Sequence, residues 1–576
     1  MSVSPAIFES AGKRTEHYIP GVYSRSNNIT SPSGVNAGNM VILGSSSGGE
    51  PGTLLTFSSL SEAKDTLVNG ELLKAVGYCF KASNEYIPQN VSVMRVNKGV
   101  QSSVELNDSN GEKTLRLKSW DYGAHTNLVK VWIQEGTKSN SYKISVGYKD
   151  DVTTIDNIQK PSLTLQYIGE GESATATFNT DSVKLQGVDA DGNTIDKLEV
   201  SYDDCETIAE LVTRINDSGL YQAVVVNLES NAKSKELDTT LATGITDETT
   251  FYSNLYAVIE ALESITYIGE VELLSTTVRQ VPVLTDGYVY FTGGLTPAEK
   301  LSDYIECIEK LTLEDIQIIS TPSTDKAVHA LIAAHCTEMS STINRKERTA
   351  ILGCGIGDTD ENNIAETVSL NNRLVSFVGD CGTAVNPVSG ETENISGAMI
   401  ACMLAAMESS MAVNESLTFK SLNLSSVTNR RTNSNIENLI KAGVVVVNPN
   451  PENASELVVI RSMTTYQGDN DLIDCERSMV REDLYMNRDL RSRFVNGIGH
   501  PNDTSESKIL TTLHIAAKEW ADAGYIQASD NGYVFDEKVK FSGDKVYLTY
   551  SRYLTAPRNF VFITATNLLY ESTVEL

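Results

Sequence analysis

Residues 298–352 read AEKLSDYIECIEKLTLEDIQIISTPSTDKAVHALIAAHCTEMSSTINRKERTAIL, and helical and extended patterns alternate along them. Apolar side chains recur at the spacing of one helix face in 298–311, and a short apolar strand follows at 316–319. A second helix is expected over 325–343 before another strand at 349–352. Because a helix separates each strand from the next, the strands can lie parallel. The stretch predicts a parallel or mixed β-sheet covered by helices.

The alternation continues on both sides of this stretch. Upstream, a buried strand is expected at 40–44, two helices within 59–81, and another strand at 91–96. Downstream, the next apolar strands fall at 375–378 and 444–447. These segments extend the predicted α/β domain well beyond its central stretch.

A different pattern fills residues 101–248, where short strands alternate apolar and polar side chains between turn signals. One helix is expected near 206–216, and the run 189–193 (DADGN) is typical of a hairpin turn. Because α/β texture lies on both sides of this block, we interpret it as a β-rich domain inserted into the α/β domain.

Both ends of the chain carry extended segments suited to pairing. Val546, Leu548 and Tyr550 alternate with their neighbours as in a strand, and 560–563 (FVFI) is apolar on both faces. We expect no partner for these strands within the chain, so their free backbone groups invite pairing with another chain. Near the other end, 17–26 (HYIPGVYSRS) is aromatic and extended by its X-Pro step. Such ends predict a chain that polymerises.

These patterns together predict a mixed α/β and β protein with several domains. Its centre is an α/β sheet domain with an inserted, sandwich-like β-rich domain. An α+β C-terminal domain with two long helices follows, and extended arms lie at both ends. The expected boundaries are 1–38 for the N-terminal arm, 39–100 and 249–450 for the two parts of the α/β domain, 101–248 for the insert, 451–544 for the C-terminal domain and 545–576 for the C-terminal β-arm.

Composition argues against several classes of partner. The 576 residues include 46 basic and 75 acidic side chains, and the net charge of −29 opposes binding to nucleic acid or anionic membranes. The longest weakly polar run, 395–407, is about 13 residues, which is too short to cross a ~30 Å hydrocarbon layer, so we expect a buried helix there. Eight dispersed cysteines without a CxxC pair are typical of reduced thiols, and residues 1–10 lack the pattern of a signal peptide.

Two glycine-rich motifs resemble catalytic or cofactor sites but lack the required context. Residues 44–48 (GSSSG) match a nucleophile elbow, yet Gly49, Pro51 and Gly52 prolong a loop where the elbow needs a helix at once. In 353–358 (GCGIGD) the third glycine comes one place early for a dinucleotide loop, and the final aspartate would face the pyrophosphate. We interpret both as plain loops and predict no catalytic residue, no cofactor and no enzyme activity.

Candidate metal ligands are incomplete in the same way. The runs 189–193 and 358–362 match the first three EF-hand ligand positions, but each lacks the glycine at position six and the glutamate at position twelve. His329 and His335 lie on different faces of one expected helix, and His335 falls in line with apolar neighbours. We predict no metal site and a hydrogen-bonded core histidine at His335.

The helix expected over 474–493 ends with a basic cluster on an otherwise acidic chain. Arg488, Arg491 and Arg493 stand against Asp489 in its last turns. One such residue would be enough to complement the C-terminal dipole of the helix. The surplus leaves two interpretations open, a solvated helix end or a surface that binds a partner.

The order of four segments resembles the contractile tail sheath proteins of bacteriophages and related injection machines. Each motif is short, and their order along the chain carries the resemblance. It covers nearly the whole chain except 101–248, where sheath proteins vary most. The segments are the arm Tyr18-Ile19-Pro20-Gly21-Val22-Tyr23, the strand and loop 289–294 (VYFTGG) with its following helix, the run 428–432 (TNRRT) leading through Gly443 into 444–447, and the C-terminal pair of helices with its β-arm.

The resemblance implies assembly rather than catalysis. Copies would form a six-fold helical sleeve around a tail tube in the virion, assembled in the host cytoplasm and in contact with baseplate and tail terminator proteins. The sleeve would shorten by releasing stored strain, without nucleotide and without inserting into a membrane. The arms would pair with neighbouring subunits through Tyr18, Ile19, Val22, Tyr23, Val546, Leu548, Tyr550, Phe560 and Phe562. The C-terminal domain would face an acidic tube surface through Arg488, Arg491, Arg493 or Lys518.

Three alternatives stay open. The sheath could belong to a phage-derived, bacteriocin-like injection particle instead of a virus. A bacterial surface filament would share the strand-exchanging ends but should carry an export signal. A subtilisin-like or esterase-like hydrolase would share the α/β core but should place a serine, a histidine and an acid in suitable contexts.

Overall fold

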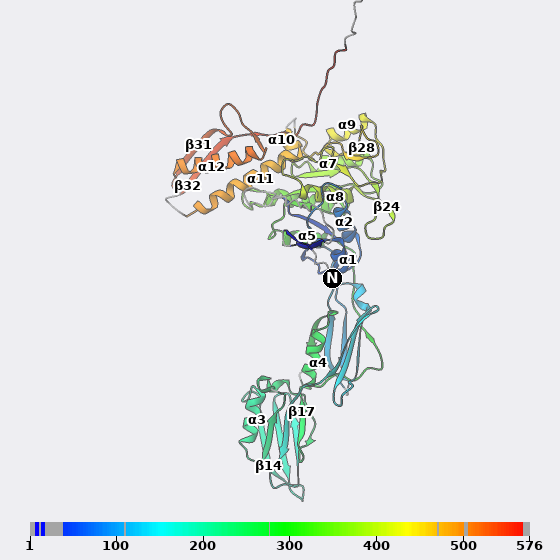
Figure 1. Cartoon of the computed structure of the whole chain (residues 1–576), viewed down its shortest axis with the longest axis vertical. Helices are drawn as coiled ribbons and strands as arrows, with labels where there is room; N and C mark the ends of the chain where they lie inside the picture. Colours follow the sequence, from blue (N-terminus) through cyan, green and yellow to red (C-terminus); the bar gives the residue numbers. More distant parts are fainter. Residues whose placement is uncertain are drawn as a thin grey trace, which may run out of the picture.

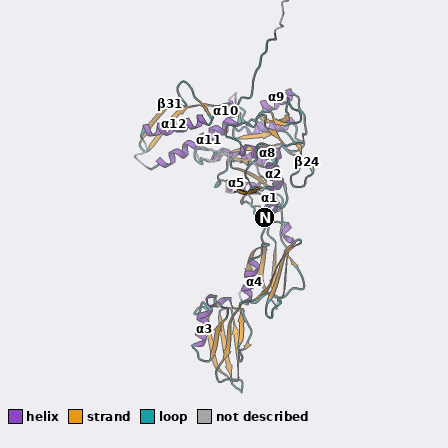
Figure 2. Cartoon of the chain, in the orientation of Figure 1, coloured by secondary structure: helices purple, strands orange, loops and turns teal. Residues whose placement is uncertain are grey.

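The computed structural model describes residues 6–10, 13–17, 38–108, 111–227, 229–275, 277–468, 472–499 and 505–567. It confirms a mixed α/β protein of several parts. Figure 1 shows a broad upper body of helices and sheets with two β-rich units hanging below it, one beyond the other. Figure 2 shows that most helices gather in the body, whereas strands dominate the two lower units.

A seven-stranded sheet forms the centre of the body. All neighbouring strands in it are parallel except β4, which runs antiparallel to β5. Every residue of β3, β20, β21 and β22 is buried, as expected for strands covered on both faces. In spatial order the strands are β27 Val444–Val445, β22 Val375–Val378, β21 Thr349–Gly353, β20 Ile318–Ser320, β3 Met40–Gly44, β5 Val91–Arg95 and β4 Leu54–Phe57.

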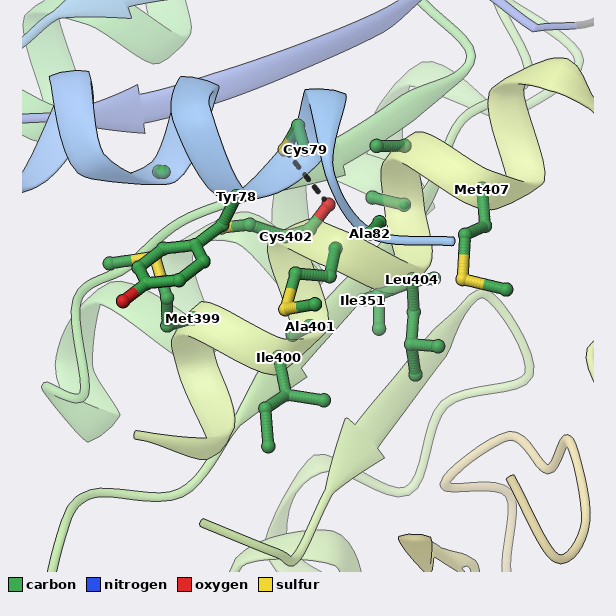
Figure 3. Close-up of a cluster of buried hydrophobic side chains, with 14 of the residues drawn as sticks. Tyr78, Cys79, Ala82, Ile351, Met399, Ile400, Ala401, Cys402, Leu404 and Met407 are labelled. Atoms are coloured by element: carbon green, nitrogen blue, oxygen red, sulfur yellow. Dashed lines mark hydrogen bonds between the residues drawn. The ribbon is translucent and has the colours of Figure 1, made fainter. Parts of the chain in front are cut away.

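Helices cover both faces of this sheet. The helices α2 (Glu71–Phe80) and α8 (Gly397–Ser410) share one core cluster, and α5 (Leu301–Leu311) and α6 (Lys326–Met339) share the other. The residues of α8 from Gly397 to Glu408 are all buried, which confirms the helix expected from the run 395–407. Figure 3 shows α2 and α8 in contact, where the Cys79 thiol donates to the Cys402 carbonyl over 3.2 Å.

Shorter elements complete the body. The helices α1 (Leu60–Leu67), α7 (Asp360–Leu370) and α9 (Asn433–Lys441) lie in this part of the chain. Two three-stranded sheets pack beside the main one; they comprise β24 Thr392–Ile395, β23 Gly382–Val385 and β26 Ser426–Val427, and β25 Ser421–Leu422, β29 Leu457–Val459 and β28 Val447–Pro449. An isolated antiparallel hairpin of β1 (Ala6–Ser10) and β2 (Lys13–His17) starts the described chain.

The upper β-rich unit packs α4 (Asn254–Glu263) and two sheets around one core that includes Ile133, Ile144 and Leu255. Its sheets pair strands from before residue 160 with strands from after residue 267. The strands are β18 Ile268–Leu273, β7 Lys113–Ser119 and β6 Ser103–Asn107 in one sheet, and β10 Asp151–Ile158, β9 Tyr142–Tyr148, β8 Val129–Glu135 and β19 Val289–Tyr290 in the other.

The lower β-rich unit has a separate core under α3 (Ile208–Asn216), with Leu165 and Phe178 among its members. The chain enters it at Pro161 and leaves it at Tyr252, and these two residues pair across adjacent strands. The strands are β15 Tyr221–Val225, β11 Pro161–Tyr167 and β17 Thr249–Tyr252, and β14 Thr194–Ser201, β13 Ser182–Val188, β12 Ser173–Phe178 and β16 Thr243–Gly244. The block expected as one domain ending at 248 therefore contains two cores, and β17, α4, β18 and β19 join it from beyond that boundary.

A buried arginine fixes the junction between the body and the upper β-rich unit. Nη1 of Arg95 donates to the carbonyls of Gly49 and Tyr122 over 2.7 and 2.8 Å. The carboxylate of Asp121 accepts from the Gly49 amide over 2.8 Å. The loop that begins at Gly44 is thereby fastened to the insert. Gly49 and Gly52 in this loop have φ angles of 87° and 67°, which favour glycine.

The C-terminal part packs two long helices against short strands. The helices α11 (Arg477–Phe494) and α12 (Glu506–Asp522) share a core around Trp520, and α10 (Leu472–Cys475) precedes them. Strand β31 (Phe535–Ser542) pairs with β32 (Lys545–Ser551), and β30 (Ile526–Gln527) pairs with β33 (Tyr553–Leu554). Within the described ranges, no helix is both long and apolar enough to cross a membrane.

Candidate inter-subunit surfaces

The C-terminal arm leaves the body as an exposed apolar segment. Phe560, Val561, Phe562 and Ile563 are 67, 77, 91 and 87% exposed. No strand pairing is assigned to 555–567, the last stretch that the structure describes. Figure 1 shows this end of the chain running away from the helices. Four adjacent exposed apolar side chains on an extended backbone make a segment that gains free energy by pairing and burial elsewhere.

Two residues at the root of the arm hold it to the body. Nδ2 of Asn559 donates to Oε2 of Glu476 over 3.0 Å. The Arg461 guanidinium lies 5.7 Å from the ring centroid of Phe560 and 3.7 Å from the Glu476 carboxylate. Burial raises the pKa of Glu476, and the bonds from Asn559 and Ser416 oppose that rise. The arm therefore starts from a fixed point and is exposed beyond it.

The strand that carries Val546, Leu548 and Tyr550 has a partner in its own chain. Val546 pairs with Phe541, and Leu548 pairs with Val539. The expectation that this strand has nothing to close against is therefore wrong. Residues 535–542 (FDEKVKFS) form the missing partner, and their charged side chains hide the strand pattern because this hairpin lies at the surface. Leu548 and Tyr550 pack against the core around Trp520.

In the part of the chain that the structure describes, β31 and β32 form a sheet of just two strands. Each strand therefore has one edge that no described strand covers. Phe541, Val546 and Tyr547 on this hairpin are 47, 40 and 52% exposed. A two-stranded hairpin is weak by itself, and a further strand would complete its hydrogen bonding. Tyr18, Ile19, Val22 and Tyr23 of the expected N-terminal arm lie outside the described residues.

The three arginines expected to face a tube all form ion pairs within the chain. Arg488 pairs with Asp315, Arg491 with Glu347 at 2.5 Å, and Arg493 with both Asp489 and Glu519. The first two pairs connect α11 to the segments that enter β20 and β21. Lys518 is exposed and lines a groove of about 870 Å³ together with His514 and Glu537. No ion pair to Lys518 occurs among the described residues.

A buried ionic network fastens α11 to the central sheet. Arg477 donates from Nε and Nη2 to the two carboxylate oxygens of Glu408 on α8, both over 2.7 Å. Its Nη1 donates to the Ala350 carbonyl of β21 over 2.8 Å, and Nη2 of Arg481 donates to the Glu408 carbonyl over 3.2 Å. All these side chains are buried. Local sequence patterns do not indicate this network, because its members are far apart along the chain.

One buried carboxyl group on α11 lacks hydrogen-bond partners for its oxygens among the described residues. Glu482 is fully buried, and neither of its side-chain oxygens has a hydrogen-bond partner among the described residues. Burial raises its pKa to about 8, against the opposing effect of Arg481 and Arg552. The group therefore stays mostly protonated at neutral pH. Its buried oxygens without hydrogen bonds destabilise the folded chain beside the network.

The motifs set aside in the sequence have structural roles. The Ser46 hydroxyl is buried and donates to the Gly48 carbonyl over 2.7 Å. The Asp358 carboxylate accepts from the Gly355 amide over 2.7 Å. His335 contacts Nη1 of Arg348 at 2.7 Å, and burial and that charge lower its pKa to about 4. The predicted core histidine is confirmed. No cluster of three potential metal ligands occurs in the described part of the chain.

The chain matches no family model, but it has clear relatives. It is 26% identical to the tail sheath protein of Bacillus phage SP01 over 96% of this chain and 95% of that protein. It is 22% identical to the tail sheath protein of Staphylococcus phage Twort over 78% of this chain and 80% of that protein.

Solved structures support the same fold. The sheath tail protein of Listeria innocua matches with a TM-score of 0.54 at 12% identity, covering 91% of this chain and 96% of that one. The sheath tail protein of Desulfitobacterium hafniense matches with a TM-score of 0.53 at 14% identity, covering 93% and 100%. The resemblance expected from the order of four segments is confirmed: by sequence this chain is a relative of phage tail sheath proteins.

Proposed function

We propose that the chain is the structural subunit of a contractile tail sheath, which polymerises helically around a tail tube and shortens to drive the tube through the host envelope. The observation that carries this proposal is the similarity to the SP01 tail sheath protein along nearly the full length of both chains. The exposed arm at Phe560–Ile563 adds a physical means of polymerisation. The sheath acts in the virion tail, assembles in the host cytoplasm, and contacts tube, baseplate and terminator proteins.

The subunits join by strand exchange between terminal arms and the hairpin of β31 and β32. An arm from one neighbour adds to the free edge of β32, and Phe560 and Phe562 bury their rings on the hairpin beside Val546. The N-terminal arm around Tyr18, Ile19, Val22 and Tyr23 supplies a further strand. Because the donor and acceptor surfaces differ, the contact repeats without closing and generates a helix.

The parts of the chain take different places in this sleeve. The helices α11 and α12 lie toward the tube, where Lys518 is the best-placed cation. Arg488, Arg491 and Arg493 add positive charge to this surface, although their ion pairs within the chain neutralise part of it. The two β-rich units, from about residue 100 to about residue 295, face outward. Contraction draws on strain stored during assembly, and a kinetic barrier holds the extended state.

Electron microscopy of the purified chain tests the proposal. The intact chain should form rings or tubes, and a chain ending at residue 555 should stay monomeric because it keeps the hairpin but loses the arm. A finer test compares two double variants of the full chain. The variant that carries both Phe560→Ser and Phe562→Ser should fail to form tubes, whereas the control that carries both Thr564→Ser and Thr566→Ser should form them. A monomeric intact chain, or tubes formed equally well by the shortened chain, would contradict strand exchange.

A sheath subunit of a phage-derived injection particle is the second candidate. Purified particles that carry no DNA-filled head would favour it over a virus. The remaining alternative is a hydrolase, and labelling with a serine-reactive fluorophosphonate tests it directly. Stoichiometric labelling would contradict a purely structural role.

A further inference from the structure

Two thiols face each other at the carboxyl end of the central sheet. Cys354 follows the last residue of β21, and Cys381 follows β22 by three positions. Their sulfur atoms are 3.6 Å apart. The two strands are parallel neighbours with Gly353 opposite Val378, so their ends place the cysteines on adjoining loops.

The two cysteines differ in access. Cys354 is 2% exposed, whereas Cys381 is half-buried beside the exposed loop 356–359. Cys79 and Cys402 also lie close together, but both are fully buried, and the Cys79 thiol donates to a backbone carbonyl. Only the first of these two pairs combines facing sulfur atoms with a route for a small reagent.

Hydrogen bonding prepares Cys381 as the attacking group. Either thiol can donate in the contact between the two sulfur atoms. The contact with Cys354 lowers the pKa of Cys381, while burial acts in the opposite direction. The same bond and burial raise the pKa of Cys354. The thiolate is the nucleophile in disulfide exchange, so the accessible member of the pair is also the more easily ionised one.

We propose that Cys354 and Cys381 form an intramolecular disulfide by exchange with a low-molecular-weight disulfide. The Cys381 thiolate attacks one sulfur of the reagent, forms a mixed disulfide and releases one reagent thiolate. Cys354 then loses its proton and attacks the Cys381 sulfur, which releases the second reagent thiol. Two protein thiols are oxidised and one reagent disulfide is reduced to two thiols.

The surroundings already hold both loops at the required spacing. Arg431 pairs with Asp360 after the first loop and with Asp380 beside Cys381. The second oxygen of Asp380 accepts from the Val447 amide over 2.7 Å. Closing the bond to about 2.05 Å needs a movement of roughly 1.5 Å, which side-chain rotation of two cysteines can supply. The bond would fasten β21 and β22 at the end where their loops meet.

Treatment of the purified full-length chain with 2-hydroxyethyl disulfide tests this inference. Titratable thiols should fall from eight to six. Peptide mapping without reduction should recover a single bridge joining the peptides of Cys354 and Cys381, and dithiothreitol should reverse it. The thermal transition of the oxidised chain should rise by about 5 °C or more.

Variants separate the two steps. Cys354→Ser should stop at a mixed disulfide on Cys381, and Cys381→Ser should not react at this site. The control Cys475→Ser alters the other half-buried cysteine and should still lose two thiols. A stable reagent adduct on Cys381 of the natural chain, or eight free thiols after treatment, would overturn the proposal without use of any variant. None of these outcomes depends on the sheath function.

Discussion

The side-chain amide of Asn559 donates a 3.0 Å hydrogen bond to the carboxylate of Glu476, which is 0% exposed. One partner sits at the root of the exposed arm, and the other directly precedes α11, whose first residue Arg477 binds Glu408. Arg477 also donates to the Ala350 carbonyl of β21, so two hydrogen bonds and the peptide bond between Glu476 and Arg477 connect the arm to the central sheet. If a neighbouring copy displaced the arm, the first contact to change would be the hydrogen bond to Glu476.

We expect Asn559→Ala to loosen the arm and to destabilise the C-terminal part by about 1 to 2 kcal/mol, because the buried Glu476 loses a hydrogen-bond donor. Hydrogen exchange should accelerate in residues 555–560, and limited proteolysis should cut there sooner. Asn531→Ala changes an exposed loop asparagine and is the matched control. Equal exchange in both variants would show that this bond does not hold the arm.

Arg477→Met should destabilise the body by about 3 to 5 kcal/mol in urea unfolding, because Glu408 would keep a buried charge without its main partner. The double variant Arg477→Met with Glu408→Met should recover part of that loss, since Glu408 then leaves no unpaired buried carboxylate and only Arg481 loses a charged partner. A double variant as unstable as the single one would mean that packing, rather than the ion pair, dominates at this position.

Glu482→Gln should stabilise the chain at neutral pH. The pKa of Glu482 is raised to about 8 in the folded chain, from 4.5, so the folded state binds more protons between these values. Natural-chain stability therefore falls as pH rises from about 4.5 to 8 and levels off above. The variant should gain roughly 2 to 3 kcal/mol at pH 7 and nothing near pH 4.

Urea midpoints across this pH range measure the difference directly. Glu452→Gln, at an exposed loop position, is the control and should shift neither curve. If the natural chain and the Glu482 variant keep the same separation at every pH, Glu482 is not the titrating group.

Lys518→Glu should weaken decoration of purified tail tubes by about tenfold or more, through loss and reversal of a charge that no described ion pair within the chain neutralises. Arg491→Glu should weaken decoration as well, but it also breaks the pair with Glu347, so its folding must be checked by thermal unfolding. Lys197→Glu, on an exposed strand of the lower β-rich unit, is the control. Unchanged decoration by Lys518→Glu would remove Lys518 from the tube surface.

Polymerisation should weaken at low ionic strength, because each copy carries a net charge of −29 and like charges repel most when salt is scarce. Light scattering should rise as salt increases from about 10 to about 300 mM. A flat response would show that arm pairing outweighs charge repulsion throughout this range.

The sequence predicted the fold best in segments whose local apolar pattern alone determines whether they are buried. The strands β21 and β22 fall where apolar runs predicted them, and α8 is buried on all sides as its composition indicates. The hairpin partner 535–542 escaped detection because an exposed strand has no apolar face to mark it. The division of the insert into two cores and the Arg477–Glu408 pair depend on contacts between distant segments, which local periodicity does not encode.

The lower β-rich unit begins at Pro161 and ends at Tyr252, and these residues stand opposite each other on neighbouring strands. Two ends so close together can be joined by a short linker without moving either one. That segment of the chain can therefore be exchanged for an unrelated domain whose own termini are adjacent, provided that two contacts across its boundary are replaced. Asp238 accepts from the first amides of α4, and Arg279 donates to the carbonyls of Leu237 and Asn179. A particle built from such subunits would display the grafted domain once per copy.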